Sequence, residues 1–533
     1  MVNVLTHSYP KDYISETLRK SAWSSDPLGL YPHEGIHSNW ESITSSVSSQ
    51  FGEEQRAELV EIISSQMGGA VSASQRENLE SLKKDNTFLA VTGQQIHLGL
   101  GPMYVIYKIA SAIVLCNDLK RKFTDKNFVP LFWMATEDHD VAEINHVDLF
   151  GDRFTCDIDW KTGVGTIPTQ DFGGLWDWMR QKFQRDAEAL ARIEKLVELY
   201  QAEDRNLSSA TSHWVSNLFA DFGLLILDPN VTAFKKRAIK IFEADLFDNQ
   251  IFSAFSDQSS EMKKHKISPP AHFRECNLFW IDAHRRERIV KDGDDFVLVD
   301  SGEKISNQEM RGILTSTPEH FSPNVLLRPL YQQAILPSIA YIAGPTEYLY
   351  WLQTSRAFSI LQVSAPALIH RMGGVVVSAT QNKKINQLGL KAEELFLDSS
   401  DLKSMLVQRI SGDNALEIAQ GKIELGIKEY LEVLYQWKSD SLVDLKKQSE
   451  IFVKSQRKAT DEAISKYLAT KLSEDAWKTV GVLQNDTFSI NNPQERRLNF
   501  IQLYLGGQID WLSEICKGES YDSQSAFWCI LLV

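Results

Sequence analysis

The chain of 533 residues is too long for a single small hydrophobic core, and its length predicts two to four domains. Hydrophobic residues make up 43% of the sequence and charged residues 24%, values typical of a globular protein in water. The net charge of −14 would repel a phosphate backbone, so we expect no nucleic-acid partner.

The sequence also argues against export and against a membrane. Its first twenty residues lack the apolar segment of a signal peptide, and no run of about 18 apolar residues occurs that could span a bilayer. The five cysteines include no CxxC pair, which is typical of reduced thiols. They are Cys116, Cys156, Cys276, Cys516 and Cys529. We therefore expect a cytoplasmic protein.

In chain order, residues 1–86 read as mostly helical, with amphipathic helices at 51–66 and 72–84. A long helix at 103–123 is apolar on most sides, so it should be covered on most sides. Five short apolar segments read as buried strands: 87–93, 127–140, 222–230, 338–347 and 365–378. Apolar strands that alternate with helices predict a parallel sheet with both faces covered.

Two more polar stretches, 150–215 and 232–322, read as insertions into this sheet domain, and "KDGDD" (291–295) in the second predicts a hairpin turn. Residues 427–480 contain no Gly and no Pro, and heptad-like spacing predicts a coiled-coil arm that dimerises. The alternative is a long helix packed on its own domain. The expected segments are 1–149 (helices and first half of the core), 150–215, 216–231 (a core strand), 232–322, 323–390 (second half of the core) and 391–533 (a helical coiled-coil domain whose last segment returns to the core).

Ligands of a parallel sheet bind beyond the carboxyl ends of its strands, and three polar loops follow predicted strand ends. The first is "TGQQIHLGLGP" (92–102). It matches no phosphate-binding template, but a glycine loop before a helix can direct backbone N–H groups toward an anion. Its Gln94 and Gln95 can both donate and accept hydrogen bonds. The alternative is a purely structural turn.

The second loop, "TEDHD" (136–140), gathers acids around one histidine. On a following helix, His139, Glu143 and His146 would share one face, which leaves open a metal site and a metal-dependent hydrolase. The other interpretation is a general base, because neighbouring carboxylates can move the pKa of a histidine.

The third loop, "AGPTE" (343–347), places Glu347 at a strand end. Nearby Arg328 stands in an apolar stretch, where its guanidinium needs a partner, either a substrate carboxylate or phosphate or an acid of the core. The sequence contains no GxSxG motif, and no cysteine has a recognisable catalytic neighbourhood.

Four blocks of the sequence together resemble one family. They are "GQQIHLGLGPMYVIYKIASAIVLCNDL" (93–119), "PLFWMATEDHDVAEINHVDL" (130–149), "NVLLRPLYQQAILPSIAYIAGPTEYLYW" (324–351) and "NNPQERRLNFIQLYLG" (491–506). In this order they are similar to the signature blocks of the bacillithiol biosynthesis cysteine-adding enzymes, the BshC family.

The resemblance implies a Rossmann-like parallel sheet core of the class I synthetase and nucleotidyltransferase type, two connecting-peptide insertions, and a helical coiled-coil domain that forms a homodimer. It implies a ligase that adds L-cysteine to glucosaminyl malate through an amide bond, in the last step of bacillithiol biosynthesis. An amide forms only from an activated carboxylate, so ATP or another nucleotide is expected, and a metal requirement stays open. A catalytically inactive coiled-coil scaffold is a further alternative.

The resemblance and the loops together give the expected site. Catalytic candidates are Asp138, His139 and Asp140, one of which would take the proton of the attacking amine. His97 stands at a variable loop position and is left out. Substrate-binding candidates are Gln94, Gln95, Gly99, Gly101, Glu137, Asn145, Arg328, Gln332, Gly344 and Glu347. No residue is assigned as a metal ligand.

Overall fold

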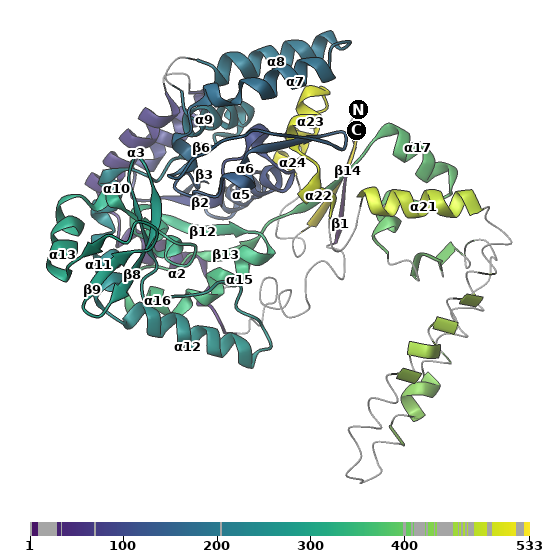
Figure 1. Ribbon diagram of the computed structural model, residues 1–533. Helices are drawn as coiled ribbons and strands as arrows, with labels where there is room; N and C mark the ends of the chain where they lie inside the picture. The colour runs from purple at the N-terminus through teal and green to yellow at the C-terminus, as the bar shows by residue number, and fades with distance from the viewer. Residues whose placement is uncertain are drawn as a thin grey trace. The chain divides into compact units, whose positions relative to one another are not determined.

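The protein divides into two compact units in the computed structural model (Figure 1). One contains Met1–Gly374 and Glu495–Cys529, and the other contains Val375–Gln494 and Ile530–Val533. The structure describes residues 3–8, 29–33, 35–68, 71–202, 205–397, 474–487, 493–518 and 527–533, with scattered residues between 401 and 466.

A sheet of five parallel strands lies at the centre of the first unit, in the order β13-β12-β2-β3-β6 (Figure 1). Its strands are β2 (Thr87–Gln94), β3 (Asn127–Met134), β6 (Leu225–Leu227), β12 (Ser338–Ala343) and β13 (Ala367–His370). They are almost entirely buried, as expected for apolar strands covered on both faces. All five predicted strands and the parallel sheet are confirmed.

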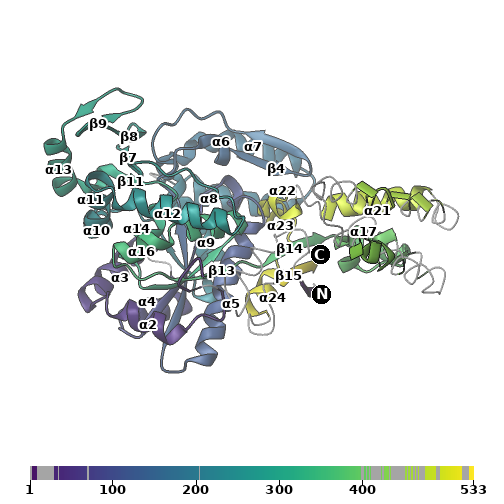
Figure 2. The same cartoon turned by 90° about the horizontal axis from the view of Figure 1, so that it is seen from below.

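Helices cover this sheet. Helix α5 (Tyr104–Lys122) packs against β2 and β3 and is buried along most of its length, which explains why it is apolar on most sides. Three helices nearer the N-terminus also pack against strands of this sheet: α2 (Trp40–Ser48), α3 (Glu53–Met67) and α4 (Ala73–Leu82), which Figure 2 shows grouped on one side of the unit. The helices predicted at 51–66, 72–84 and 103–123 are therefore confirmed.

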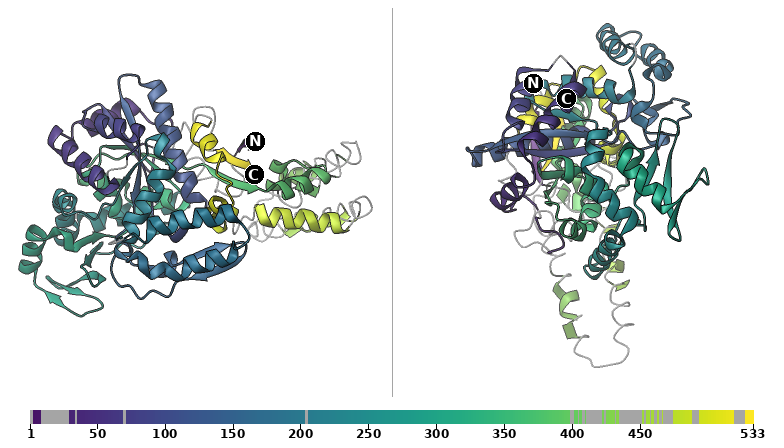
Figure 3. Two further views of the ribbon diagram at one scale, coloured as in Figure 1. Left: turned by 90° about the horizontal axis from the view of Figure 1, so that it is seen from above. Right: turned by 90° about the vertical axis from the view of Figure 1, so that its left-hand side faces the viewer.

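Between β3 and β6 the chain forms a small hairpin and a group of helices. Helix α6 (Val141–Ile144) leads into the antiparallel strands β4 (His146–Leu149) and β5 (Asp152–Thr155). After the 3-10 turns η2 (Val164–Thr166) and η3 (Thr169–Phe172), the helices α7 and α8 pack side by side (Figure 1, Figure 3). The helices of this region are α7 (Gly173–Lys182), α8 (Ala187–Tyr200) and α9 (Leu207–Leu218), and the short turn η4 (Ala220–Phe222) precedes β6.

Between β6 and β12 the chain forms helices and a second, antiparallel sheet in the order β10-β9-β8-β7-β11. The helices are α10 (Thr232–Arg237), α11 (Ile239–Phe247), α12 (Gln250–Lys264) and α13 (Asn307–Ser316). The strands are β7 (Leu278–Ile281), β8 (Arg286–Asp292), β9 (Asp295–Leu298), β10 (Lys304–Ile305) and β11 (Phe321–Pro323), with η5 (Pro318–His320) before β11. The turn predicted at "KDGDD" joins β8 to β9, where Gly293 has a positive φ of 67°.

The second half of the core contains α14 (Arg328–Ile335), α15 (Pro345–Gln353) and α16 (Ser355–Ile360). In the second unit, α21 (Glu474–Thr487) packs against α17 (Ala379–Gln387) and η6 (Ala392–Phe396). The chain passes between the units inside β14 (Gly373–Val377), at the start of α22 (Gln494–Arg497) and inside β15 (Phe527–Leu532). Strand β1 (Asn3–Ser8) lies near the N-terminus. Most of the arm predicted at 427–480 lies outside the described residues.

The last part of the first unit runs beside the loop that follows β2. The Met103 N–H donates to Leu498 O at 2.9 Å, and the Phe500 N–H donates to Gly101 O at 2.9 Å. The helices here are α22 (Gln494–Arg497), α23 (Phe500–Leu505) and α24 (Trp511–Lys517). The fourth family-like block (491–506) therefore contacts the first one (93–119) through backbone hydrogen bonds.

Candidate active site

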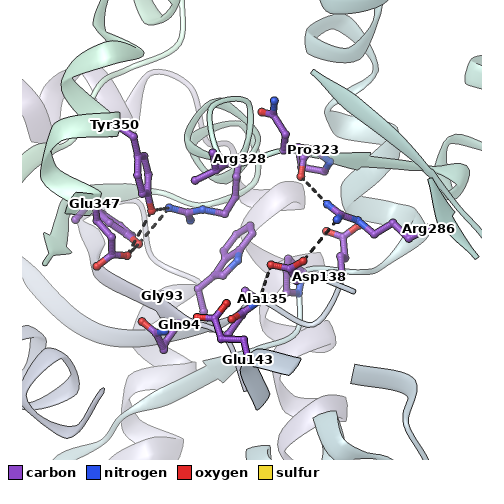
Figure 4. Close-up of a pocket in the computed structure, with 17 residues that line it drawn as sticks. Gly93, Gln94, Ala135, Asp138, Glu143, Arg286, Pro323, Arg328, Glu347 and Tyr350 are labelled. Atoms are coloured by element: carbon purple, nitrogen blue, oxygen red, sulfur yellow. Dashed lines mark hydrogen bonds and ion pairs between the residues drawn. The ribbon is translucent and has the colours of Figure 1, made fainter. Parts of the chain in front are cut away.

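A pocket with a volume of about 310 Å³ opens where β2, β3 and β12 end (Figure 4). Side chains from the second antiparallel sheet and from α14 and α15 complete its wall. The lining residues are Gly93, Gln94, Gln95, Trp133, Ala135, Glu137, Asp138, Glu143, Pro229, Arg286, Pro323, Asn324, Val325, Arg328, Tyr341, Glu347 and Tyr350. The three loops that the sequence singled out thus contribute to one pocket.

The first loop contributes both glutamines. The Gln94 amide donates to the Tyr104 hydroxyl at 3.1 Å and accepts from Lys108 Nζ at 3.2 Å. The Gln95 Nε2 donates to Asp138 Oδ2 at 2.6 Å. At Gly93 an added Cβ would stand 3.2 Å from the Tyr341 hydroxyl, so a larger residue would press against a tyrosine of the pocket.

The other glycines of this loop lie outside the pocket lining. Gly99 and Gly101 have positive φ angles of 65° and 71°, and an added Cβ at Gly101 would approach the ring of His97 to 2.8 Å. His97 is only 7% exposed, and burial, followed by the nearby His146, lowers its pKa to about 4. The structure thus explains these glycines by backbone conformation and packing, and their predicted role in substrate binding stays a prediction.

The acids of the second loop have different partners. Glu137 pairs with Lys235 Nζ, which also donates to Phe321 O at 2.9 Å, and the Lys235 side chain is fully buried. The Asp138 carboxylate lies in the pocket, 3.6 Å from Arg286 Nη1. Burial alone would raise the pKa of Asp138, but hydrogen bonds with His139 and the charge of Arg286 lower it to about 2.

The remaining two catalytic candidates lie just outside the lining. Asp140 caps α6, where its Oδ1 accepts from the Glu143 N–H at 3.3 Å. His139 Nδ1 is 2.8 Å from Arg286 Nη1, and the guanidinium of Arg286 stacks 3.9 Å from the centre of the Phe279 ring. His139 therefore contacts the pocket through Arg286 and Asp138, and the role of either His139 or Asp140 as a base stays a prediction.

The third loop supplies a carboxylate held from three sides. Glu347 Oε2 accepts from Lys108 Nζ at 2.7 Å and from the Gly344 N–H at 2.8 Å, and Oε1 accepts from the Tyr341 hydroxyl at 2.9 Å. Burial alone would raise the pKa of Glu347, but Lys108, Gly344 and Arg328 bring it below its usual value. Burial lowers the pKa of Lys108, and Glu347 offsets part of that effect.

Arg328 projects into the pocket from the first turn of α14, next to Tyr350 (Figure 4). Its guanidinium donates to Gln332 Oε1 at 3.0 Å and to the hydroxyls of Tyr341 and Tyr350 at 3.1 and 3.4 Å. The rings of Trp133, Tyr341 and Trp351 surround it at 5.1–5.7 Å from their centres. Within the described residues Arg328 forms no ion pair with a carboxylate, so the core salt bridge considered from the sequence is not found there.

Three further predicted residues lie outside the pocket lining and contact other parts of the protein. The buried Gln332 holds Arg328, and Gly344 is the N-cap of α15, which positions Glu347. Asn145 ends α6, and its Nδ2 donates to Cys156 O at 3.0 Å. Their direct contact with substrate stays a prediction.

Sequence reasoning missed several residues of this pocket. Lys108 carries a usable signal, because it is the only basic residue between Met103 and Leu119 in an otherwise apolar helix. Arg286 stands among charged residues in "HRRER" (284–288), and nothing in the sequence separates it from its neighbours. The lining tyrosines and tryptophan read as core residues: Trp133, Tyr341 and Tyr350.

The metal alternative lacks a suitable geometry. Among the residues that the structure describes, no group of three His, Cys, Asp or Glu side chains is placed to hold a metal ion. His146 lies in β4, beyond the short helix α6, rather than on one long helix face with His139 and Glu143. The hydrolase interpretation therefore has no support from this site.

Two family models match the chain, one for each of its two main parts. Residues 29–372 match the model described as bacillithiol biosynthesis BshC, N-terminal Rossmann-like domain, and residues 374–529 match the C-terminal coiled-coil domain of the same family. The chain belongs to the BshC family. This confirms the predicted Rossmann-like core and the coiled-coil character of the C-terminal region.

Relatives in this family are named "Putative cysteine ligase BshC". One from Cytophaga hutchinsonii is 34% identical over 399 residues, which cover 73% of this chain and 74% of the relative. One from Flavobacterium psychrophilum is 33% identical and covers 82% and 81%, and one from Flavobacterium johnsoniae is 31% identical and covers 89% of both chains. Their names support the prediction that this BshC family member is an enzyme of the ligase class. In the part of the chain that the structure describes, no helix combines the length and apolar character needed to cross a membrane.

Proposed function

We propose that the chain joins the carboxyl group of L-cysteine to the amine of glucosaminyl malate, forming an amide in bacillithiol biosynthesis. The observation that carries this proposal is the opposed charge of the two sides of the pocket. On one side Arg328 lies near Glu347, a carboxylate that also pairs with Lys108. On the other side Asp138 lies beside Arg286, and Glu143 has no cationic partner among the described residues (Figure 4).

This distribution suits an acceptor with an amine at one end and carboxylates at the other. Glucosaminyl malate has that form, with its amine on the sugar and two carboxylates on the malate. A guanidinium binds a carboxylate with two parallel hydrogen bonds, and acids favour a protonated or attacking amine. We place the malate at Arg328 and the sugar amine at Asp138 and Glu143.

Amide formation also needs an activated carboxyl group, because a free carboxylate and an amine do not condense in water. We propose that the carboxyl of cysteine is activated as an acyl phosphate or acyl adenylate formed with ATP or another nucleoside triphosphate. The nucleotide and the activating residues are not assigned. We further propose that the enzyme works in the cytoplasm on these small molecules and as a homodimer.

Metabolite analysis of a deletion strain tests the proposal. Cells that lack the gene should accumulate glucosaminyl malate and contain no bacillithiol, and expression of the wild-type chain should restore bacillithiol. Bacillithiol is measured by mass spectrometry after thiol labelling, and glucosaminyl malate, which has no thiol, is measured by mass spectrometry without labelling. Normal bacillithiol in the deletion strain, with no second copy of the gene, would overturn the proposed function.

A further inference from the structure

Two carboxylates on the acidic side of the pocket, Asp138 and Glu143, have very different partners. Asp138 accepts from Gln95 Nε2 at 2.6 Å and from the His139 N–H at 2.7 Å, and it lies 3.6 Å from the Arg286 guanidinium. Glu143 forms no ion pair with any Lys, Arg or His among the described residues, and its side-chain partner is the amide of Gln95. One carboxylate is therefore engaged and the other is free to act on a ligand.

Gln95 ties the two carboxylates together. Its amide donates to Asp138, and it is also the hydrogen-bond partner of the Glu143 side chain. Its own Oε1 is buried without a hydrogen-bond partner in the described part of the chain, as expected when both N–H groups are turned toward acids. This arrangement fixes Glu143 at the rim of the pocket beside Asp138.

The surroundings of Glu143 shift its titration in the direction opposite to that of Asp138. Burial, then the charges of Asp138 and Asp140, raises the pKa of Glu143 above its usual value. The phenol of Tyr104 on α5 also faces it, and the imidazole of His97 hydrogen-bonds to its backbone. A pair of carboxylates whose pKa values are pushed apart is the usual arrangement of an acid–base site, with one member ionised throughout and the other more readily protonated.

We propose that Glu143 is the general base that takes the proton from the attacking amine. This inference rests on the proposed function. The amine nitrogen attacks the carboxyl carbon of the cysteinyl phosphate or adenylate, and the C–N bond forms. The bond from that carbon to the phosphate oxygen breaks, the phosphate or AMP leaves with the electron pair, and the ammonium proton passes to the Glu143 carboxylate. Asp138 stays ionised and holds the amine in place.

The contacts of the other candidates favour Glu143 over them. Asp138 is held by Arg286 and Gln95, and Asp140 is engaged as the cap of α6. His139 directs its Nδ1 to Arg286 and is absent from the pocket lining. Of the acids and the histidine in this segment, Glu143 alone both lines the pocket and lacks a cationic partner among the described residues.

The test compares Glu143→Gln with the wild-type chain and with Glu275→Gln. The control makes the same chemical change at an exposed glutamate outside the pocket. Purified full-length proteins are assayed by mass spectrometry for amide formation from L-cysteine, glucosaminyl malate and ATP, and by calorimetry for binding of glucosaminyl malate. We expect Glu143→Gln to lower amide formation by about 10²- to 10⁴-fold, the range for loss of a general base, while the Kd changes less than about threefold.

The pH profile separates a base from a structural residue. The carboxylate must be ionised to accept a proton, so wild-type turnover should fall as the pH drops through the raised pKa of Glu143. The substrate amine titrates alike in both proteins. A fall in rate at acidic pH that the wild type shows and Glu143→Gln lacks therefore comes from titration of Glu143. Glu143→Asp keeps a carboxyl group, so its rate should be lower than that of the wild type but should still fall at acidic pH.

The outcomes divide cleanly. Amide formation by Glu143→Gln within about threefold of the wild type would overturn the assignment of Glu143 and leave the proposed function intact. A deletion strain that keeps normal bacillithiol would instead overturn the proposed function, and this inference with it. A large loss of turnover in Glu143→Gln, with unchanged binding and without the fall in rate at acidic pH, would support both.

Discussion

At the scale of single residues, two charged side chains of the site, Arg328 and Lys108, stand in stretches of sequence that are otherwise mostly apolar. The Arg328 guanidinium donates to the neutral side chains of Gln332 and Tyr341, and the Lys108 ammonium donates to the carboxylate of Glu347. An arginine that forms no direct ion pair with a carboxylate keeps its capacity to bind an anionic ligand. The same logic explains why Arg286, which contacts Asp138, is a weaker candidate for a substrate carboxylate.

Arg328→Lys tests the anionic end of the acceptor. Lysine keeps the charge but loses the planar fork, so two hydrogen bonds to a carboxylate become one. Because hydrogen bonds to charged groups contribute about 1.5–3 kcal/mol, we expect the Kd for glucosaminyl malate to rise roughly tenfold or more in calorimetry. Arg311→Lys is the matched control, because that guanidinium also stacks on an aromatic ring, Phe247 at 3.8 Å, but lies outside the pocket. An unchanged Kd for Arg328→Lys would refute this placement of the malate.

At the scale of elements, the connection from β2 to α5 depends on the two left-handed glycines. Gly101→Ala should lower the free energy of unfolding through two effects, a strained positive φ and a clash with the ring of His97. Gly302→Ala separates them, because Gly302 has the same φ of 71° and no atom within 4 Å of an added Cβ. In urea unfolding we expect Gly101→Ala to cost about 1–3 kcal/mol more than Gly302→Ala, the usual range for overpacking. Equal losses would show that His97 moves aside without cost.

Sequence reasoning predicted the elements of the core well and the makeup of the site only in part. Buried parallel strands read as short apolar runs, so β2, β3, β6, β12 and β13 could be found without any knowledge of the fold. Polar loops at their ends gave Gln94, Gln95, Asp138 and Glu347, because parallel strands bring their carboxyl ends to one edge.

The missed residues come from elements whose position the sequence does not specify. Arg286 reaches the pocket from β8 of an antiparallel sheet about 150 residues after Asp138, and no local pattern reveals how that sheet docks. Tyr341 stands inside β12, where the apolar run is typical of a core position. Glu143 was considered only as a metal ligand, because a longer helix was expected where α6 spans Val141–Ile144 and β4 begins at His146.

At the scale of the whole molecule, the coiled-coil domain carries apolar side chains that its own described residues leave exposed. Leu425, Tyr430, Val433, Ile451 and Phe452 are each 48–59% exposed. The rings of Tyr430 and Phe452 lie 6.5 Å apart, so two segments of this domain run beside each other there. A cluster of exposed large apolar residues usually marks a surface that another molecule covers.

Homodimer formation through this surface is the last prediction. The heptad-like spacing of residues 423–463 places apolar residues on one side of a helix, and pairing with a second copy would bury them. Light scattering at micromolar concentration should give about twice the chain mass of 60.5 kDa. The double variant Tyr430→Glu with Phe452→Glu, at two exposed positions of the heptad-like pattern, should give the monomer mass, because a charge in an apolar contact is costly to bury. Val299→Glu, at a position 40% exposed in the first unit, controls for the added charge and should stay dimeric. A wild-type monomer at that concentration, or a double variant that remains a dimer, would contradict an interface built on these residues.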